Sequence, residues 1–186
     1  VFLKYRWMFE PVFAATKSLL TIHNLAYQGL FPKEKFPLLG LPWMVFSMNG
    51  LEYYDKINLL KGGIVFADAV NTVSRGYSQE IQTPEYGYGL EGVLKHRRAV
   101  LFGIVNGVNY EDWNPETDPL IAANFGPKDL KGKAKNKTAL MEAYNLDQKL
   151  AQAPILGIIS RLADQKGFDL VAEVLKQNGV QVELNA

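Results

Sequence analysis

The stretch Pro154-Ile155-Leu156-Gly157-Ile158-Ile159-Ser160-Arg161-Leu162-Ala163-Asp164-Gln165-Lys166-Gly167 joins an apolar run to a cationic turn. The apolar or small residues 154–159 predict a strand that is covered on both faces. After the turn, apolar residues recur at i, i+3, i+4 and i+7, the period of a helix: Phe168, Val171, Ala172 and Leu175. The segment therefore predicts a strand, a turn and a helix, the repeating unit of an α/β fold with a parallel sheet.

Two cations, Arg161 and Lys166, stand at this predicted turn. In an open α/β sheet, ligands bind beyond the carboxyl ends of strands, where helix N-termini direct N–H groups and a partial positive charge toward an anion. The pattern predicts a phosphate site. On spacing alone, a structural role is equally compatible, with Arg161 capping a neighbouring carbonyl and Lys166 solvated in the first turn.

The rest of the chain also alternates strand and helix, which indicates the α/β class. We predict strands at 19–22, 69–73 and 100–105, and a helix face formed by Ile57, Leu60, Ile64 and Val65. The hydroxyl of Ser74 is predicted to cap a helix over 75–81. Residues 29–42, rich in Pro, Gly and Lys, predict an irregular surface loop, and 128–144 predicts a solvated helix.

Composition excludes several classes of protein. With 20 basic and 19 acidic residues the formal charge is +1, so no field of one sign favours nucleic acid or an anionic membrane. The absence of cysteine excludes disulfides and thiolate metal sites and is compatible with a reducing cytosol. No apolar run approaches the ~18 residues typical of a membrane span. We expect a cytoplasmic protein without membrane or nucleic-acid partners.

Five further motifs occur in order along the chain, and with the first stretch they carry a family resemblance. They are HNLAYQG at 23–29, SMNGLE at 47–52, NTVS at 71–74, YGYGLEG at 86–92, and VNGV at 105–108 followed by WNP at 113–115. In order and spacing the sequence resembles the bacterial glycogen synthases and plant starch synthases, which are retaining glucosyltransferases that use a sugar nucleotide. The resemblance covers nearly the whole chain.

This resemblance implies a GT-B fold, in which two Rossmann-like domains with parallel sheets face a cleft. It implies that residues 1–107 are the later part of the first, acceptor-side domain, that 108–150 form the interdomain crossover and a helix, and that 151–186 open the nucleotide-binding domain. The alternation at 180–184 predicts a starting strand. We expect a chain truncated at both ends, inactive alone because the family's amino-terminal Lys- and Gly-rich loop and its carboxyl-terminal acidic motif are missing.

The resemblance also implies roles for individual residues. His23 matches the active-site histidine that contacts the donor sugar, although a lone histidine at a strand end is more often structural. Asn24 lines the same pocket, and Asn106 matches an asparagine at the domain hinge. Arg161 and Lys166 match the pair that holds the distal phosphates of the nucleotide and stabilises the departing charge.

Other residues are expected on the acceptor side of the cleft or outside the site. Tyr86, Tyr88 and Gly89 are expected to line the glucan cleft, where aromatic faces suit apolar sugar faces. Directly after VNGV the chain has Asn109 where the family commonly has aspartate, which weakens any role for that position. Lys61-Gly62-Gly63 is interpreted as a closely packed helix rather than a nucleotide loop, and His96 as a surface residue.

The predicted function is transfer of glucose from ADP-glucose to the non-reducing 4-hydroxyl of an α-1,4-glucan, with retention and without a cofactor or metal. The carboxylates Asp164, Asp169, Glu111 and Asp112 do not form a cluster at ligand spacing. UDP-glucose stays open as donor, and a plastid location would apply in a plant. The alternatives are a sucrose or trehalose-phosphate synthase type of GT-B enzyme and a noncatalytic glucan-binding module.

Overall fold

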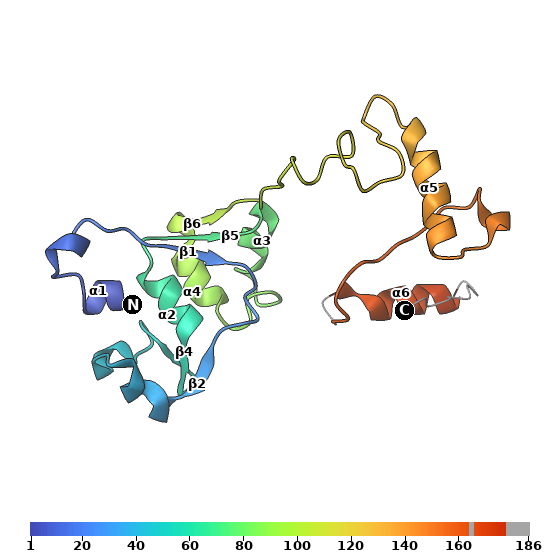
Figure 1. The fold of residues 1–186 in the computed structure, drawn as a ribbon. Coiled ribbons are helices and arrows are strands. Elements are labelled where there is room, and N and C mark those ends of the chain that lie inside the picture. Colours follow the sequence, from blue (N-terminus) through green and yellow to red (C-terminus); the bar gives the residue numbers. More distant parts are fainter. Residues whose placement is uncertain (164–165, 178–186) are drawn as a thin grey trace. The chain divides into compact units, whose positions relative to one another are not determined.

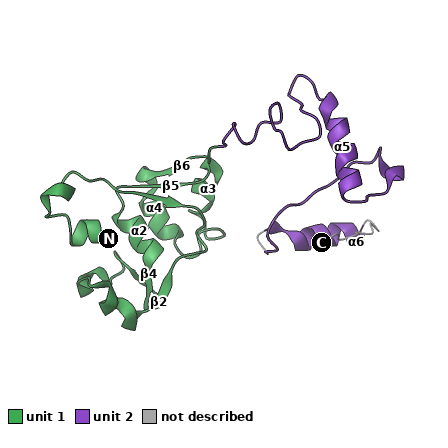
Figure 2. Ribbon diagram, viewed as in Figure 1, with its two compact units in different colours: residues 1–107 green, residues 108–186 purple. Residues whose placement is uncertain are grey.

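A computed structural model of the chain describes residues 1–163 and 166–177. The chain divides into two compact units, residues 1–107 and residues 108–186 (Figure 2). The strand predicted at 180–184 lies outside the described residues. The elements of the first unit are α1 (Phe2–Tyr5), η1 (Pro11–Phe13), β1 (Leu19–Ile22), β2 (Leu30–Pro32), η2 (Lys33–Leu39), η3 (Trp43–Val45), β3 (Glu52–Tyr53), β4 (Lys56–Asn58), α2 (Leu59–Phe66), β5 (Ala69–Thr72), α3 (Arg75–Glu80), α4 (Glu91–His96), η4 (Arg98–Val100) and β6 (Leu101–Gly103).

The main sheet of the first unit is parallel, with strand order β1-β5-β6 (Figure 1). Ile22 pairs with Thr72, and Thr72 pairs with Gly103, so the three strands end level with one another. Both connections between these neighbours run through helices, as parallel pairing requires. The α/β class predicted from sequence is confirmed, and so are the strands at 19–22 and 69–72.

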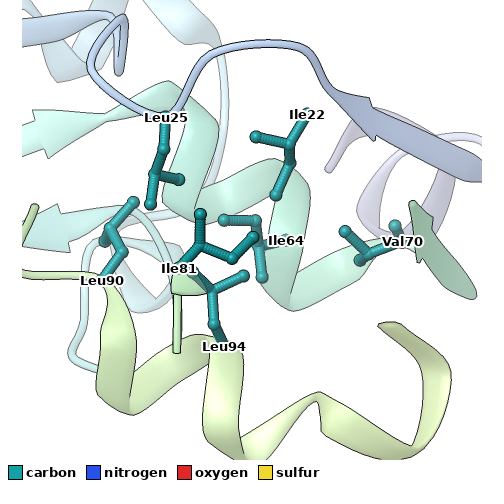
Figure 3. Packing of buried hydrophobic residues seen from close by; sticks show 8 residues of the cluster. Ile22, Leu25, Ile64, Val70, Ile81, Leu90 and Leu94 are labelled. Carbon is teal, nitrogen blue, oxygen red and sulfur yellow. The ribbon is translucent and has the colours of Figure 1, made fainter. Parts of the chain in front are cut away.

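The core of this unit lies between the parallel sheet and its helices (Figure 3). Side chains from both strands and helices converge there, and the fully buried ones are Ile22, Leu25, Ile64, Val70, Ile81, Leu90 and Leu94. Burial of each such side chain stabilises the fold by about 1.5–3 kcal/mol. Along β1 the buried Ile22 follows the exposed Thr21, which fixes the register of this strand against the helices. In β5, Val70, Asn71 and Thr72 are all buried.

A second, antiparallel sheet has the order β2-β4-β3. Its strand β2 and the 3-10 helix η2 lie in the segment 29–42, so the predicted irregular loop is wrong there. Leu30 pairs with Asn58, and Phe36 is completely buried in a smaller core with Leu41, Val45, Leu51 and Ile57. Proline and glycine dominate the local pattern, but pairing with a strand more than twenty residues away decides the structure.

Helix α2 begins at Leu59, so Ile57, which lies in β4, is not part of the predicted helix face. The side chain of Asn58 caps the helix by accepting a hydrogen bond from the Lys61 N–H at 2.8 Å. A Cβ on Gly62 would lie 2.9 Å from Leu51 Cγ, and one on Gly63 would lie 3.2 Å from Leu20 Cδ2. The interpretation of 61–63 as a closely packed helix is confirmed.

The described part of the second unit contains the helices α5 (Lys131–Ala143), η5 (Gln148–Leu150) and α6 (Phe168–Gln177). The mostly exposed α5 confirms the predicted solvated helix, and its buried member is Met141. Asn136 fastens the preceding loop to α5, because its amide donates to the Ala123 carbonyl at 2.8 Å and its carbonyl accepts from the Ala123 N–H at 2.9 Å.

The strand predicted at 154–159 is not formed in the described residues. The segment has no assigned secondary structure, and Leu156 and Ile159 are fully exposed. The apolar composition of a buried strand is present, but a strand also needs a neighbour that accepts and donates its backbone hydrogen bonds. Among the described residues of this unit the only β pairing is an isolated bridge between Gly126 and Asp129. The helix predicted after the turn is confirmed as α6.

Candidate functional site

Polar residues follow the carboxyl ends of all three parallel strands. His23 and Asn24 come directly after β1, and Ser74 comes two residues after β5. Asn106 follows β6 by three residues, beyond Ile104, whose N–H still donates to the Thr72 carbonyl at 2.8 Å. Because ligands of open α/β sheets bind beyond this edge, the edge is the candidate site of the first unit.

The turn after β1 is anchored in the core by Leu25. Leu25 is completely buried, and its N–H donates to Tyr77 Oη at 3.0 Å. Asn24 Oδ1 accepts from the Ala26 N–H at 2.9 Å, which closes a tight turn. With Leu25 anchored inward, His23 is left exposed at the strand end, where the sequence placed it.

The segment 86–92 docks onto this same turn. The Tyr88 carbonyl accepts one hydrogen bond from Gln28 Nε2 and one from Tyr53 Oη, each at 3.0 Å. Tyr88 and Gly89 both have left-handed backbone, with φ of 49° and 79°. The rings of Tyr86 and Tyr88 are exposed. The two motifs HNLAYQG and YGYGLEG, distant in sequence, are therefore joined in the fold.

Sequence reasoning missed Gln28 and Tyr53, which make this connection. Gln28 lies inside the quoted motif HNLAYQG and is only 7% exposed. A glutamine in a turn is ordinarily solvated, so its burial depends on contacts that only the tertiary structure supplies. A weak signal existed only for Tyr53, because Gly89 leaves the space that the Tyr53 hydroxyl occupies.

Two tyrosines and one lysine near the site have shifted pKa values. Burial raises the pKa of Tyr53, with smaller contributions from Tyr54 and the Glu91 carboxylate. The hydrogen bond to Glu85 is the main reason that the pKa of Tyr86 is raised. Burial lowers the pKa of Lys61, whose ammonium donates to the carbonyls of Met48, at 2.7 Å, and Glu52.

The predicted phosphate ligands Arg161 and Lys166 belong to the second unit. Both are exposed, and Lys166 stands two residues before α6. Gly167 has a φ of 70°, a left-handed conformation that turns the chain into the helix, and the Lys166 N–H donates to the Ala163 carbonyl at 2.9 Å. Both cations thus precede α6 in the chain, and their role as phosphate ligands stays a prediction. His23, Asn24, Asn106 and the segment 86–92 belong to the other unit.

Within the described ranges 1–163 and 166–177, no three His, Cys, Asp or Glu side chains gather in a way that could hold a metal ion. The absence of a metal from the chemistry stays a prediction. In the same part of the chain, every helix is too short or too polar to cross a membrane. His96 is exposed at the end of α4, as interpreted from the sequence.

The parallel sheet, with polar residues along its carboxyl edge, makes the first unit an α/β structure with a candidate ligand site at the strand ends. The catalytic domain of starch synthase IV from Arabidopsis thaliana, solved with bound ADP and acarbose, matches the chain with a TM-score of 0.82 and 33% identity. That match covers 92% of this chain and 36% of the solved chain. The described fold is therefore part of a GT-B catalytic domain.

The family described as the starch synthase catalytic domain matches residues 1–96, and the chain belongs to this family. The glycogen synthase of Koribacter versatilis is 50% identical over 174 residues, which are 94% of this chain and 36% of the relative. The glycogen synthase of Myxococcus xanthus is 53% identical over 163 residues, which are 87% of this chain and 34% of the relative. The chain thus spans about a third of the length of its relatives.

Proposed function

We propose that the protein that carries this chain is a glycogen synthase, which transfers glucose from ADP-glucose to the non-reducing 4-hydroxyl of an α-1,4-glucan with retention. The observation that carries this proposal is the position of His23 and Asn24 directly beyond β1 in a chain of the starch synthase family. The choice of donor and acceptor is supported by the ADP and acarbose bound to the Arabidopsis relative. Residues 1–107 would then supply the acceptor-side domain and 151–186 the opening of the nucleotide-binding domain.

In the reaction, the bond between C1 of glucose and the diphosphate oxygen breaks, and its electrons go to the diphosphate. C1 forms a bond to the acceptor oxygen, and the hydroxyl proton is taken up by the departing diphosphate. Negative charge therefore grows on the phosphate in the transition state. Arg161 and Lys166, both exposed at the turn before α6, can stabilise that charge without a metal ion.

On the other side of the reaction, His23 would contact the glucosyl group. A neutral imidazole donates from one nitrogen and accepts at the other, so it can orient a sugar hydroxyl and respond to charge at the reacting carbon. Asn24 beside it lines the pocket, and Asn106 lies beyond the end of β6 along the same sheet edge. The exposed rings of Tyr86 and Tyr88 offer apolar faces to the acceptor glucan.

The test measures incorporation of labelled glucose into glycogen from ADP-glucose and, in parallel, from UDP-glucose. We expect ADP-glucose to be the better donor. His23→Ala should reduce kcat by at least about 100-fold, the size typical of a lost catalytic hydrogen-bonding group. His96→Ala is the matched control, because His96 is the other histidine of the chain and is exposed at the end of α4.

Three outcomes would contradict the proposal. Glucosyl transfer to fructose or glucose 6-phosphate, and not to glucan, would instead favour a sucrose or trehalose-phosphate synthase. Glucan binding that is unaffected by nucleotide, without any transfer, would favour a noncatalytic module. Equal activity of the His23→Ala and His96→Ala variants would show that His23 has no role in the reaction.

A further inference from the structure

A chain of buried side-chain amides runs from the start of α2 to the segment 86–92. The completely buried Asn58 donates from Nδ2 to Gln28 Oε1 at 2.6 Å, and Gln28 donates from Nε2 to the Tyr88 carbonyl at 3.0 Å. The Gln28 backbone carbonyl also accepts from the Leu60 N–H at 3.0 Å. Gln28 is thus fastened to α2 by main chain and side chain together, and it holds the far segment.

The direction of this amide chain is fixed at both ends by backbone groups. Asn58 Oδ1 accepts from the Lys61 N–H, which leaves Nδ2 as the donor toward Gln28. Gln28 must then accept with its oxygen and donate with its nitrogen, and the Tyr88 carbonyl can only accept. If either side-chain amide were rotated by 180°, a donor would face a donor or an acceptor would face an acceptor at a buried position. Leaving buried polar groups unpaired in this way costs more than the loss of one exposed hydrogen bond.

The segment that receives this chain has a backbone that needs support. Tyr88 has a φ of 49°, unusual for a residue with a side chain, and Gly89 follows with 79°. Both hydrogen bonds to the Tyr88 carbonyl, from Gln28 and Tyr53, act on the peptide between these two left-handed residues. Loss of the donors would free this peptide to rotate and carry the exposed Tyr88 ring with it.

We infer that Gln28 is a positioning residue that holds the peptide after Tyr88, and thereby sets the acceptor side of the site. The inference rests on the proposed function for its kinetic part, since Tyr88 is assigned there to the glucan. Gln28 acts through Tyr88 and touches no substrate itself. Its position within HNLAYQG couples the turn that carries His23 to the segment that carries Tyr88.

Gln28→Glu is the sharpest variant, because it keeps the shape and the acceptor for Asn58 but replaces the donor to Tyr88 with an oxygen. Gln82→Glu is its matched control: Gln82 Nε2 also donates to a backbone carbonyl, that of Ser78, at 2.7 Å in the same unit. Amide hydrogen exchange in the peptide covering 84–92 should be roughly tenfold faster in Gln28→Glu and unchanged in Gln82→Glu. Unchanged exchange in both variants would overturn the inference.

The kinetic measurement separates positioning from general destabilisation. In Gln28→Glu we expect KM for glucan to rise about fivefold or more, with KM for ADP-glucose within about twofold of the parent. Faster exchange together with unchanged KM for glucan would overturn the role in acceptor binding. If the parent protein transfers no glucose at all, the proposed function fails, and the exchange measurement still decides whether Gln28 holds the segment.

Discussion

A Cβ atom at position 89 would lie 2.0 Å from Tyr53 Oη and 3.2 Å from Tyr53 Cζ. Gly89 is therefore required for two independent reasons, its left-handed backbone and the tyrosine hydroxyl that occupies the space of a side chain. The same hydroxyl donates to the Tyr88 carbonyl. Tyr53 thus both fills the position beside Gly89 and holds the peptide that precedes it.

This relationship predicts a measurable coupling between positions 53 and 89. Gly89→Ala alone should lower the free energy of unfolding by more than about 1–2 kcal/mol, because the cost of a left-handed alanine is added to the clash. In a Tyr53→Phe background the hydroxyl is gone, so Gly89→Ala should cost less. Urea unfolding of the four chains checks this, and strictly additive changes would contradict the described geometry.

The N-cap of α3 predicts a local loss of stability. Ser74 Oγ accepts from the Tyr77 N–H at 2.9 Å, so Ser74→Ala should lower the free energy of unfolding by about 1 kcal/mol. Ser78→Ala is the control within the same helix. Its hydroxyl donates to the Arg75 carbonyl at 2.7 Å, a bond whose loss alanine offsets with its higher helix propensity. Equal destabilisation by both variants in denaturant unfolding would argue against the cap.

Asp68 predicts an acid-dependent loss of stability. Hydrogen bonds from the Lys4 ammonium, at 2.8 Å, and from the Ser18 N–H and hydroxyl hold the pKa of its carboxyl well below the ordinary value of 3.8. Since the pKa of Asp68 is lower in the folded chain than in the unfolded chain, its carboxylate contributes fully to stability at pH values above the unfolded-state pKa. This contribution is lost progressively as the pH falls from the unfolded-state pKa toward the folded-state pKa.

Thermal unfolding of the chain between pH 7 and pH 3 measures this effect. Asp68→Asn should be less stable at pH 7 and should lose less stability on acidification than the parent chain. Asp55→Asn, which removes the exposed partner of Lys33, should change little at any pH, because exposed ion pairs contribute little to stability. Parallel pH profiles for the parent and Asp68→Asn would rule out this linkage.

The cationic turn predicts an effect on the chemical step. In the protein that carries this chain, Arg161→Ala and Lys166→Ala should each lower kcat by roughly 100-fold, because each removes charge stabilisation that is greatest in the transition state. Lys176→Ala is the control, an exposed lysine in the last turn of the same helix α6. Steady-state kinetics that show a change in KM alone would assign the two cations to ground-state binding.

The local sequence pattern was sufficient to predict those strands and helix caps that depend on a few adjacent residues. The apolar run Leu19–Ile22 and the segment Ala69–Thr72 predicted strands of the parallel sheet, and Ser74 predicted its own cap. The placement of His23 and Asn24 beyond β1 followed from the strand that precedes them. For these residues, periodicity and capping chemistry act over a few positions, so the sequence carries the information directly.

The local sequence pattern gave the wrong secondary structure, or no signal, where a segment's structure depends on residues distant in the sequence. Residues 154–159 have the composition of a buried strand, but in the described second unit no strand pairs with them. Residues 29–42 look like a loop, yet β2 forms there because β4 is available to it. Gln28 gave no signal of its own, since its burial needs Asn58 on one side and Tyr88 on the other.

The sequence by itself determined the α/β class, the family, the strand that precedes His23 and the helix that begins after Lys166, because each depends on local periodicity or on an ordered set of motifs. Only the tertiary structure decided that Gln28 joins the turn after β1 to the peptide after Tyr88, and that Tyr53 occupies the space beside Gly89. These contacts join residues about 30 to 60 positions apart, and their hydrogen bonds form only once packing has brought the segments together.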